Sequence, residues 1–198
     1  MRVTVRKATP DDAGALAGVR AAALAEGGGP VPDAGFLEQF VSWVSDHLST
    51  HLPFVAEVDD DVVGMAWLMV AERVPSPERR YRQCGDVQSV YVIPELRDRG
   101  IGAALLRAAL AEAARLELEH VTVHSSDQAV SLYQRVGFQN DRRWLRWNRR
   151  GRALVSVSSR REAAAPGTGQ TMSSPPGVIA ALCFLAAASC GRRTRPVG

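Results

Sequence analysis

The chain has 198 residues, 46% of them hydrophobic, and a formal net charge of +3 at pH 7. This is enough apolar chain for one substantial core, while a pI near 9.0 raises the question of nucleic-acid binding. The basic excess lies at the C-terminal end, because eight arginines and one acid, Glu162, follow position 148, which leaves residues 1–148 at about −4. No aromatic side chains alternate with those arginines, so nucleic-acid binding is the least favoured function class.

Signals for secretion and for membrane insertion are weak as well. The N-terminus lacks an apolar signal segment, and the longest apolar run, Val178–Cys190, has 13 residues where a membrane helix needs about 20. The three cysteines, Cys84, Cys183 and Cys190, form no CxxC pair and indicate neither a disulfide framework nor a zinc site. We therefore predict a cytoplasmic protein without a membrane segment or a metal.

Apolar periodicity and turn residues predict alternating strands and helices. Thr9 or Asp11 caps the first helix, Pro53 closes the second, and Ser126 or Asp127 caps the last. The expected elements, in order, are a strand at 3–5, a helix ending at the glycines 27–29, a helix at 33–49, a hairpin of 54–58 and 62–70, a strand at 87–93, a helix at 100–116, a short strand at 120–124, a helix reaching about 136 and a last strand from Gly137 towards Trp144 and Trp147. This order indicates an α/β fold, a mixed sheet with helices on its faces.

The composition changes near residue 150. From Gly151 onward Ser, Gly, Pro and Ala dominate and no period persists, so we expect a folded domain at 1–148 and a basic, disordered tail at 149–198. With 23 arginines and a single lysine, Lys7, the coding sequence is expected to be GC-rich, and an out-of-frame tail stays open. A short hydrophobic anchor or partner-binding segment at Val178–Cys190 is the alternative.

The strongest local motif follows the strand at 87–93. Pro94-Glu95-Leu96 leads into Arg97-Asp98-Arg99-Gly100-Ile101-Gly102, which enters a helix without a gap. The first turn of a helix has unpaired N–H groups and a partial positive charge, and glycines let a phosphate approach the backbone. The motif alone is also compatible with a tight turn that only packs helix on strand.

A second motif makes the assignment specific. Ser126 to Phe138 reads SDQAVSLYQRVGF and resembles the NxxAxxLYxxxGF segment of the GCN5-related N-acetyltransferase (GNAT) superfamily, at the expected spacing after a first motif that resembles the same family's cofactor loop. The resemblance covers about Val3 to Trp147. It implies a splayed mixed sheet whose central parallel strands part to admit the pantetheine of acetyl-CoA.

The resemblance also implies roles for particular residues. Main-chain groups of Val90, Tyr91 and Val92 would pair with the pantetheine like an added strand. A second set would surround the pyrophosphate, chiefly through main-chain amides: Arg97, Asp98, Arg99, Gly100, Ile101, Gly102 and Ala103. Ser126 stands where the family usually has Asn in the cofactor site, so that hydrogen bond would be lost or shortened.

Two residues are candidates for proton transfer. Tyr133 matches the tyrosine that the family places near the thioester sulfur, where a phenol can protonate the departing thiolate; the alternative is a buried aromatic beside Leu132 and Phe138. Asp86 stands where some members carry a catalytic glutamate and would deprotonate the amine, directly or through water. The alternative for Asp86 is a solvated acid that ends the loop after Gly85.

The leading functional hypothesis is an acetyl-CoA-dependent N-acetyltransferase that acts by direct attack in a ternary complex. The negative charge of residues 1–148 slightly favours a small cationic amine as acceptor. Acetylation of a protein N-terminus or lysine, and a non-catalytic acyl-CoA sensor, are the alternatives. His47 and His51 lie four residues apart without a third ligand, so they are expected on a helix surface or in a substrate cleft rather than on a metal. A homodimer stays open.

Overall fold

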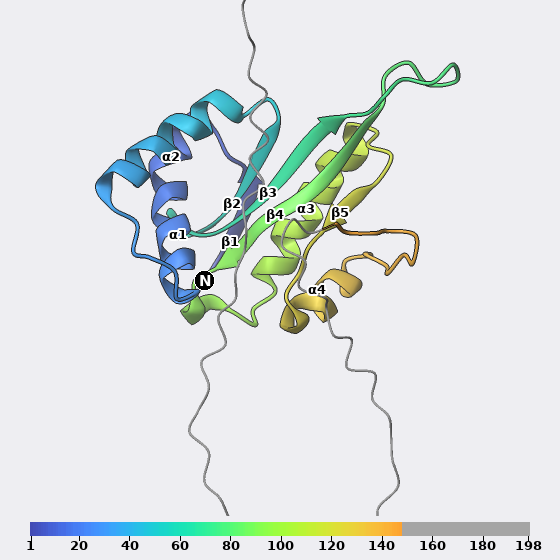
Figure 1. Ribbon diagram of the computed structural model, residues 1–198. Coiled ribbons are helices and arrows are strands. Elements are labelled where there is room, and N and C mark those ends of the chain that lie inside the picture. Colours follow the sequence, from blue (N-terminus) through green and yellow to red (C-terminus); the bar gives the residue numbers. More distant parts are fainter. Residues whose placement is uncertain (148–198) are drawn as a thin grey trace, which may run out of the picture. The chain divides into compact units, whose positions relative to one another are not determined.

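The computed structural model describes residues 1–147, so the predicted tail at 149–198 lies outside the described residues, together with Val178–Cys190. Helices and strands alternate along Met1–Phe138 and build a five-stranded sheet with helices on both faces (Figure 1). The elements are β1 (Val3–Lys7), α1 (Ala13–Glu26), α2 (Ala34–His47), β2 (His51–Val58), β3 (Asp61–Glu72), β4 (Gln83–Val92), α3 (Ile101–Arg115), β5 (Val121–Val123) and α4 (Val130–Arg135), with single 3-10 turns at Pro10–Asp12, Pro94–Leu96 and Asp127–Ala129.

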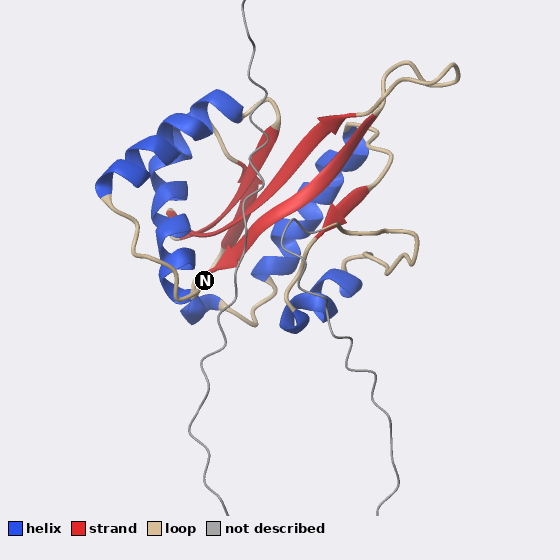
Figure 2. Cartoon of the chain, in the orientation of Figure 1, coloured by secondary structure: helices blue, strands red, loops and turns tan. Residues whose placement is uncertain are grey.

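The strands lie in the order β1-β2-β3-β4-β5. The first three neighbouring pairs are antiparallel and the β4–β5 pair is parallel, which confirms the predicted mixed α/β sheet (Figure 2). The middle of the sheet is buried on both faces, at residues 52–56 of β2 and 63–68 of β3. Such strands need apolar residues on both sides, which is why these segments are continuous apolar runs.

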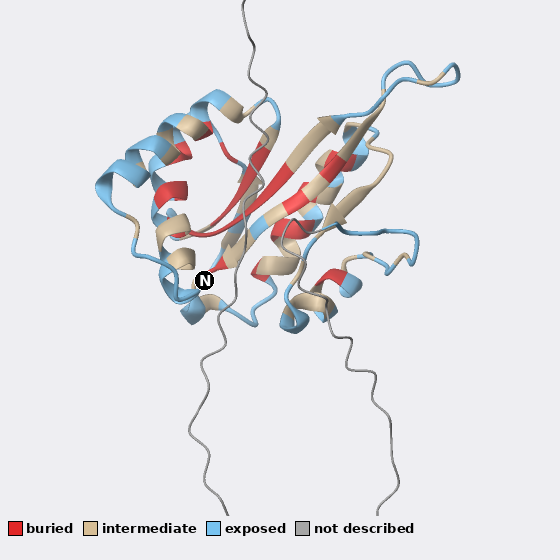
Figure 3. Ribbon diagram, viewed as in Figure 1, coloured by how far each residue is buried: buried red, intermediate tan, exposed pale blue. Residues whose placement is uncertain are grey.

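Two apolar clusters fill the two faces of the sheet. On one face Leu105, Leu106 and Ala109 of α3 pack on Phe54 and Leu68 and are fully buried or nearly so. On the other face, residues of α1 and α2 pack with three strand residues, namely Val55, Met65 and Trp67. Buried positions therefore lie along the strands and on the inner sides of the helices (Figure 3). Alternation along each strand sends neighbouring residues to opposite clusters.

Pro53 does not close the second helix as predicted. The helix α2 ends at His47, and Pro53 lies inside β2. The last β1–β2 pair is Lys7 with Phe54, and the Pro53 carbonyl accepts a hydrogen bond from Ala8 N at 2.8 Å. In an antiparallel strand the N–H and C=O of one residue point to the same side, so the N–H that Pro53 lacks would point towards β1. The β1–β2 pairing has already ended at Phe54, and the missing N–H therefore costs no hydrogen bond between the strands.

Strand β4 begins at Gln83, four residues earlier than the predicted start at Val87. Gly85 is the reason that the start is hard to predict, since glycine weakens a strand signal. A Cβ at Gly85 would lie 2.9 Å from Leu68 Cδ1 and 3.0 Å from Leu118 Cδ1, so a larger residue there would force these side chains to move. Asp86 is therefore inside a paired strand and does not end a loop.

The predicted last strand is wrong for the residues described. No strand forms over 138–147, where Trp144 is 57% exposed and Trp147 is 83% exposed. Asp141 instead makes local contacts: its carboxylate binds the Arg143 guanidinium at 2.7 Å and its carbonyl accepts from Trp144 N at 3.2 Å. Local side-chain bonds of this kind compete with strand pairing.

A cluster of charged side chains joins β1 to the turn before α1 and to β2. Arg6 binds both Asp12 oxygens at 2.7 Å and also contacts Glu57 on β2, while Thr9 N donates to Asp12 at 2.7 Å. Only 11% of the Asp12 side chain is exposed. The hydrogen bonds from Arg6, and then those from Thr9, hold the pKa of Asp12 well below its usual range.

We expect Asp12→Asn to lower the free energy of unfolding at pH 7 by about 1–3 kcal/mol, the range for hydrogen bonds to a charged group. Since the folded-state pKa is depressed, the stabilisation is present above the unfolded pKa of about 4 and is lost as the pH falls below it. Urea unfolding between pH 7 and pH 3 should therefore give a flatter acid profile for the variant. Asp11→Asn, in the same turn but exposed, is the control, and equal acid slopes for all three proteins would contradict the assignment.

Gly64 of β3 gives a second test of the packing. A Cβ there would lie 2.9 Å from the Tyr91 carbonyl oxygen and 3.3 Å from Leu105 Cδ1, so Gly64→Ala should destabilise the fold by about 1–3 kcal/mol. Gly18→Ala on α1, where nothing lies within 4 Å of the added Cβ, should raise stability by up to about 1 kcal/mol. Thermal unfolding measures both, and a Gly64 variant as stable as the parent would contradict the close approach.

Candidate functional site

The parallel pair in the sheet is short, and this opens one edge of β4. Pairing joins Gly85–Val87 to Val121–Val123 and stops there. Beyond Val87, β4 continues to Val92 with β3 on one side and, among the described residues, no strand on the other. The predicted parting of the central strands therefore has a structural basis in the three-residue length of β5.

The main chain in this outer half of β4 is turned so that some of its polar groups face the open edge. Ser89 has a positive φ of 49°, and the register with β3 shifts between Met65 and Trp67. Ile93 N donates to Val63 O on β3 at 3.0 Å. By alternation, the N–H and C=O of Val92 and Val90 point away from β3. These are two of the three residues that the sequence predicts to pair with a pantetheine.

The loop after β4 ends in a helix start without a side-chain cap. Asp98 has a φ of 59° and Gly100, in the left-handed region at 81°, is the residue before α3. The first hydrogen bond of α3 joins Ala104 N to Gly100 O at 3.0 Å. The amides of Ile101, Gly102 and Ala103 precede that bond and have no acceptor within the helix, so they form the positive end that an anion can approach.

Glycine at position 102 leaves room at this helix start. A Cβ added to Gly102 would meet only Leu132 Cδ2, at 3.5 Å, which is ordinary contact. Ile101 is 2% exposed and anchors the first turn in the α3 cluster. The helix start is thus fixed by its buried side while its amides stay at the surface.

The side chains of the two arginines in the loop are held by other groups. Arg97 donates from Nε to Val92 O at 3.0 Å and from both terminal nitrogens to Glu26 at 2.6 and 2.5 Å. Arg99 Nη1 lies 3.5 Å from Met1 Sδ. The polar atoms of Arg97 are thus engaged by Val92 and Glu26, and anion binding by the main-chain amides stays a prediction.

Asp86 lies in the paired half of β4, on the face of α1 and α2. Its neighbour Val87 belongs to the α3 cluster, so alternation turns Asp86 to the opposite face. Thr122 of β5 donates to Asp86 Oδ1 at 2.7 Å and Gln88 donates to Oδ2 at 3.2 Å. The half-buried carboxylate is therefore oriented by two neutral donors.

Tyr133 lies on the other face. It is 8% exposed in the α3 cluster, and its ring meets that of Phe138 edge-on with centroids 5.5 Å apart. Gly137, with a φ of 107°, ends α4 and lets Phe138 N bond to Tyr133 O at 3.0 Å. Ser126 is exposed and its carbonyl accepts from Ala129 N, which starts the turn before α4. Tyr133 and Asp86 thus lie on opposite faces of the sheet.

His47 and His51 belong to an aromatic group on the face of α1 and α2. The ring of Trp43 stacks on His47 at 4.5 Å and meets His51 at 5.0 Å, and the two imidazoles are 5.8 Å apart. Burial, and then the neighbouring His47, lower the pKa of His51. Pairing also places His51, Met69, Asp86 and Thr122 in one row across the strands. Within residues 1–147 no cluster of His, Cys, Asp and Glu is arranged to hold a metal ion.

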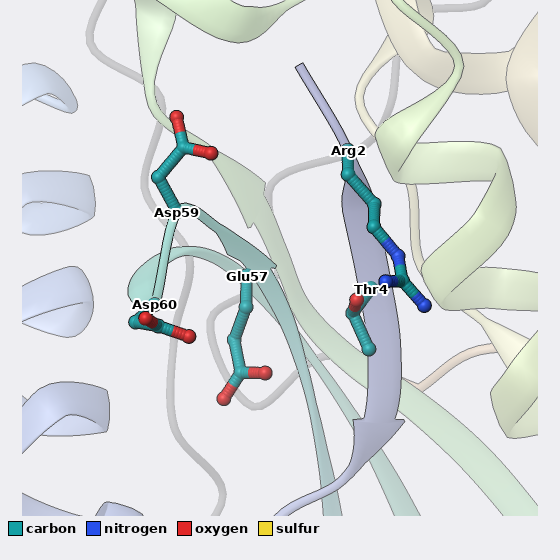
Figure 4. A pocket seen from close by; sticks show the side chains of 5 residues that line it. All are labelled: Arg2, Thr4, Glu57, Asp59 and Asp60. Carbon is teal, nitrogen blue, oxygen red and sulfur yellow. The ribbon is translucent and has the colours of Figure 1, made fainter.

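A hollow elsewhere on the surface has a different lining. It has a volume of about 290 Å³ and is lined by Arg2, Thr4, Glu57, Asp59 and Asp60 (Figure 4). None of these residues belongs to the predicted site. Among the described residues, no helix is both long and apolar enough to cross a membrane.

Three site residues were missed by the sequence reasoning. Thr122 and Gln88 orient Asp86, and nothing in their local sequence marks them because their role depends on strand register. Glu26 carries a weak sequence signal for an interaction outside its helix, since an acid in the last turn of a helix is unfavourable with the helix dipole. A partner elsewhere in the fold could have been expected for that reason.

This fold and site define an α/β protein in which an unpaired strand edge leads into the exposed amides of a helix start. The family model described as the acetyltransferase (GNAT) family matches residues 18–138. The chain belongs to this family, whose members are acyltransferases that use acetyl-CoA, and the resemblance seen in the sequence is confirmed.

Solved structures agree with the family match. A predicted acetyltransferase with acetyl-CoA from Clostridium acetobutylicum is 21% identical with a TM-score of 0.62, over 74% of this chain and 96% of that one. A GCN5-related N-acetyltransferase from Ralstonia eutropha JMP134 is 27% identical with a TM-score of 0.57, over 74% and 99%. Glucosamine-6-phosphate N-acetyltransferase from Arabidopsis thaliana is 12% identical with a TM-score of 0.59, over 75% and 99%. No curated protein matches the sequence.

Proposed function

We propose that the protein transfers the acetyl group of acetyl-CoA to a primary amine of a small molecule, by direct attack in a ternary complex. The observation that carries the proposal is the continuity of the open β4 edge with the amides at the start of α3. The edge offers main-chain groups of Val90 and the N–H of Val92, whose carbonyl already accepts from Arg97. The helix start offers the amides of Ile101, Gly102 and Ala103. An extended amide-bearing arm that ends in a pyrophosphate has the matching chemistry.

Acetyl-CoA supplies an activated acetyl group on sulfur, and the protein has to orient it and move two protons. Asp86 lies in the short parallel pair, and Tyr133 lies on the opposite face of the sheet. This suits the reaction because the amine adds to the carbonyl carbon from one side while the carbon–sulfur bond breaks towards the other. The nitrogen–carbon bond forms as the thiolate departs.

Each proton then has a group to receive or supply it. Asp86 takes the proton from the ammonium, through a water where the shorter carboxylate cannot reach. Thr122 and Gln88 keep both carboxylate oxygens directed. Tyr133 gives its phenolic proton to the thiolate, and burial in the α3 cluster keeps bulk water from competing.

The charge distribution supports a cationic small amine as the acceptor. Residues 1–148 carry about −4, which attracts a cation towards the domain. The face of α1 and α2 carries Asp86 together with the aromatic rings around Trp43. Carboxylates and aromatic faces both bind ammonium groups.

We expect the full-length protein to release free thiol from acetyl-CoA when one member of a panel of small amines is present. Gly102→Glu should abolish both this activity and CoA binding measured by calorimetry, because its carboxylate would lie at the amides proposed for the phosphates. Gly102→Ala is the matched control, since its methyl group makes only ordinary contact with Leu132. Undiminished CoA binding in the glutamate variant would contradict phosphate binding by these amides. Turnover on peptides but on no small amine would show that the acceptor is a protein.

Tyr133→Phe tests the proposed acid. The substitution keeps the ring and its contact with Phe138 and removes only the hydroxyl, so kcat should fall by about 100-fold, the lower range for a lost general acid. The affinity for CoA should change much less. Steady-state kinetics with the amine found in the screen measure this, and an unchanged kcat would withdraw the acid role.

A further inference from the structure

The last residue of α1 makes contacts that the proposed chemistry does not use. The Glu26 carboxylate accepts three hydrogen bonds: two from the Arg97 guanidinium, at 2.6 and 2.5 Å, and one from the Tyr91 hydroxyl, at 2.9 Å. The bidentate pair joins residues 71 positions apart in the sequence. It ties the helix on the acceptor face to the loop that leads into α3.

Arg97 is fixed from three directions by these contacts. Its Nε donates to the Val92 carbonyl at 3.0 Å, its guanidinium lies 5.3 Å from the centre of the Tyr91 ring, and its terminal nitrogens bind Glu26. Guanidinium groups are planar, so two parallel hydrogen bonds set orientation as well as distance. The open end of β4, the loop and α1 therefore meet at one side chain.

Helix stability does not explain an acid at this position. Glu26 is in the last turn of α1, and that turn contains no basic residue. A negative charge at this end of a helix interacts unfavourably with the helix dipole. The turn is closed instead by main-chain bonds, from Gly27 N to Ala23 O and from Gly29 N to Leu24 O. The compensating interaction is the distant one with Arg97.

Global stability does not explain the pair either. The side chains of Glu26 and Arg97 are 43% and 40% exposed, and exposed ion pairs contribute little to the stability of a fold. The hydrogen bonds from Arg97, followed by the one from Tyr91, lower the pKa of Glu26, so the carboxylate is ionised at neutral pH. What the pair determines is geometry, because it sets where the loop starts.

We propose that Glu26 is a positioning residue of the cofactor site, an inference that rests on the proposed function. Through Arg97 it holds the loop at Arg97–Gly100 in the arrangement that presents the amides of α3, and it keeps the guanidinium turned to α1. Acetyl-CoA then binds to a loop that is already ordered, so less conformational entropy is lost on binding.

The test is calorimetry with CoA on the full chain, in a double-mutant cycle. We expect Glu26→Gln and Arg97→Met each to weaken CoA binding about tenfold, and the double variant to lose no more than either single change, because both remove the same link. A residue that only supported the fold would lower the melting temperature without this non-additivity. With an amine acceptor, the Glu26 variant should show its larger change in KM for acetyl-CoA rather than in kcat.

Glu112→Gln is the control, since Glu112 is also a carboxylate in an ion pair, with Arg115 at 2.7 Å, at the other end of α3. It should bind CoA within about twofold of the parent. Unchanged or tighter binding in Glu26→Gln would overturn the positioning role, since tighter binding would mean that a freed Arg97 reaches the phosphates. Additive effects, or equal weakening by Glu112→Gln, would overturn it as well. If the parent itself bound no CoA, the proposed function would fail together with it.

Discussion

The short pairing between β4 and β5 is the constraint on which the site depends. Only three residue pairs join these strands, so the outer half of β4 keeps main-chain hydrogen-bonding groups directed at an open edge. Polar backbone groups need partners, and an edge of this kind either binds water or accepts an extended ligand. On its other edge the strand is supported by β3, and α1 contacts it at Ser89, where Arg20 donates to the hydroxyl at 3.1 Å.

Local motifs predicted the secondary structure around the cofactor motif well. The strand, the loop and the helix from Arg97 onward follow from neighbouring residues, because glycine, proline and apolar period act over a few positions. The family and the mixed sheet followed from the same motifs and were confirmed. The roles of all the site residues stay predictions, those proposed for acetyl-CoA binding as well as those of Tyr133 and Asp86.

Features that depend on pairing between distant strands were not predictable from local signals. The start of β4 was placed late because Gly85 weakens the strand pattern, although two neighbouring strands hold it in place. Pro53 was assigned to a helix end because its tolerance inside β2 depends on where β1 stops. The strand expected towards Trp147 did not form in the described residues, where Asp141 bonds locally to Arg143 and Trp144 instead.

The separation of the two apolar clusters bears on how such an enzyme can diverge. Side chains on the face of α1 and α2, such as Phe40 and Trp43, pack in one cluster, while those supporting the start of α3 pack in the other. Mutations that reshape the first face need not repack the second, so the side chains around α1 and α2 can change through evolution while the packing under α3 is kept. The bond between Glu26 and Arg97 crosses this division, and a lineage that lengthened or replaced the end of α1 would have to change both partners together.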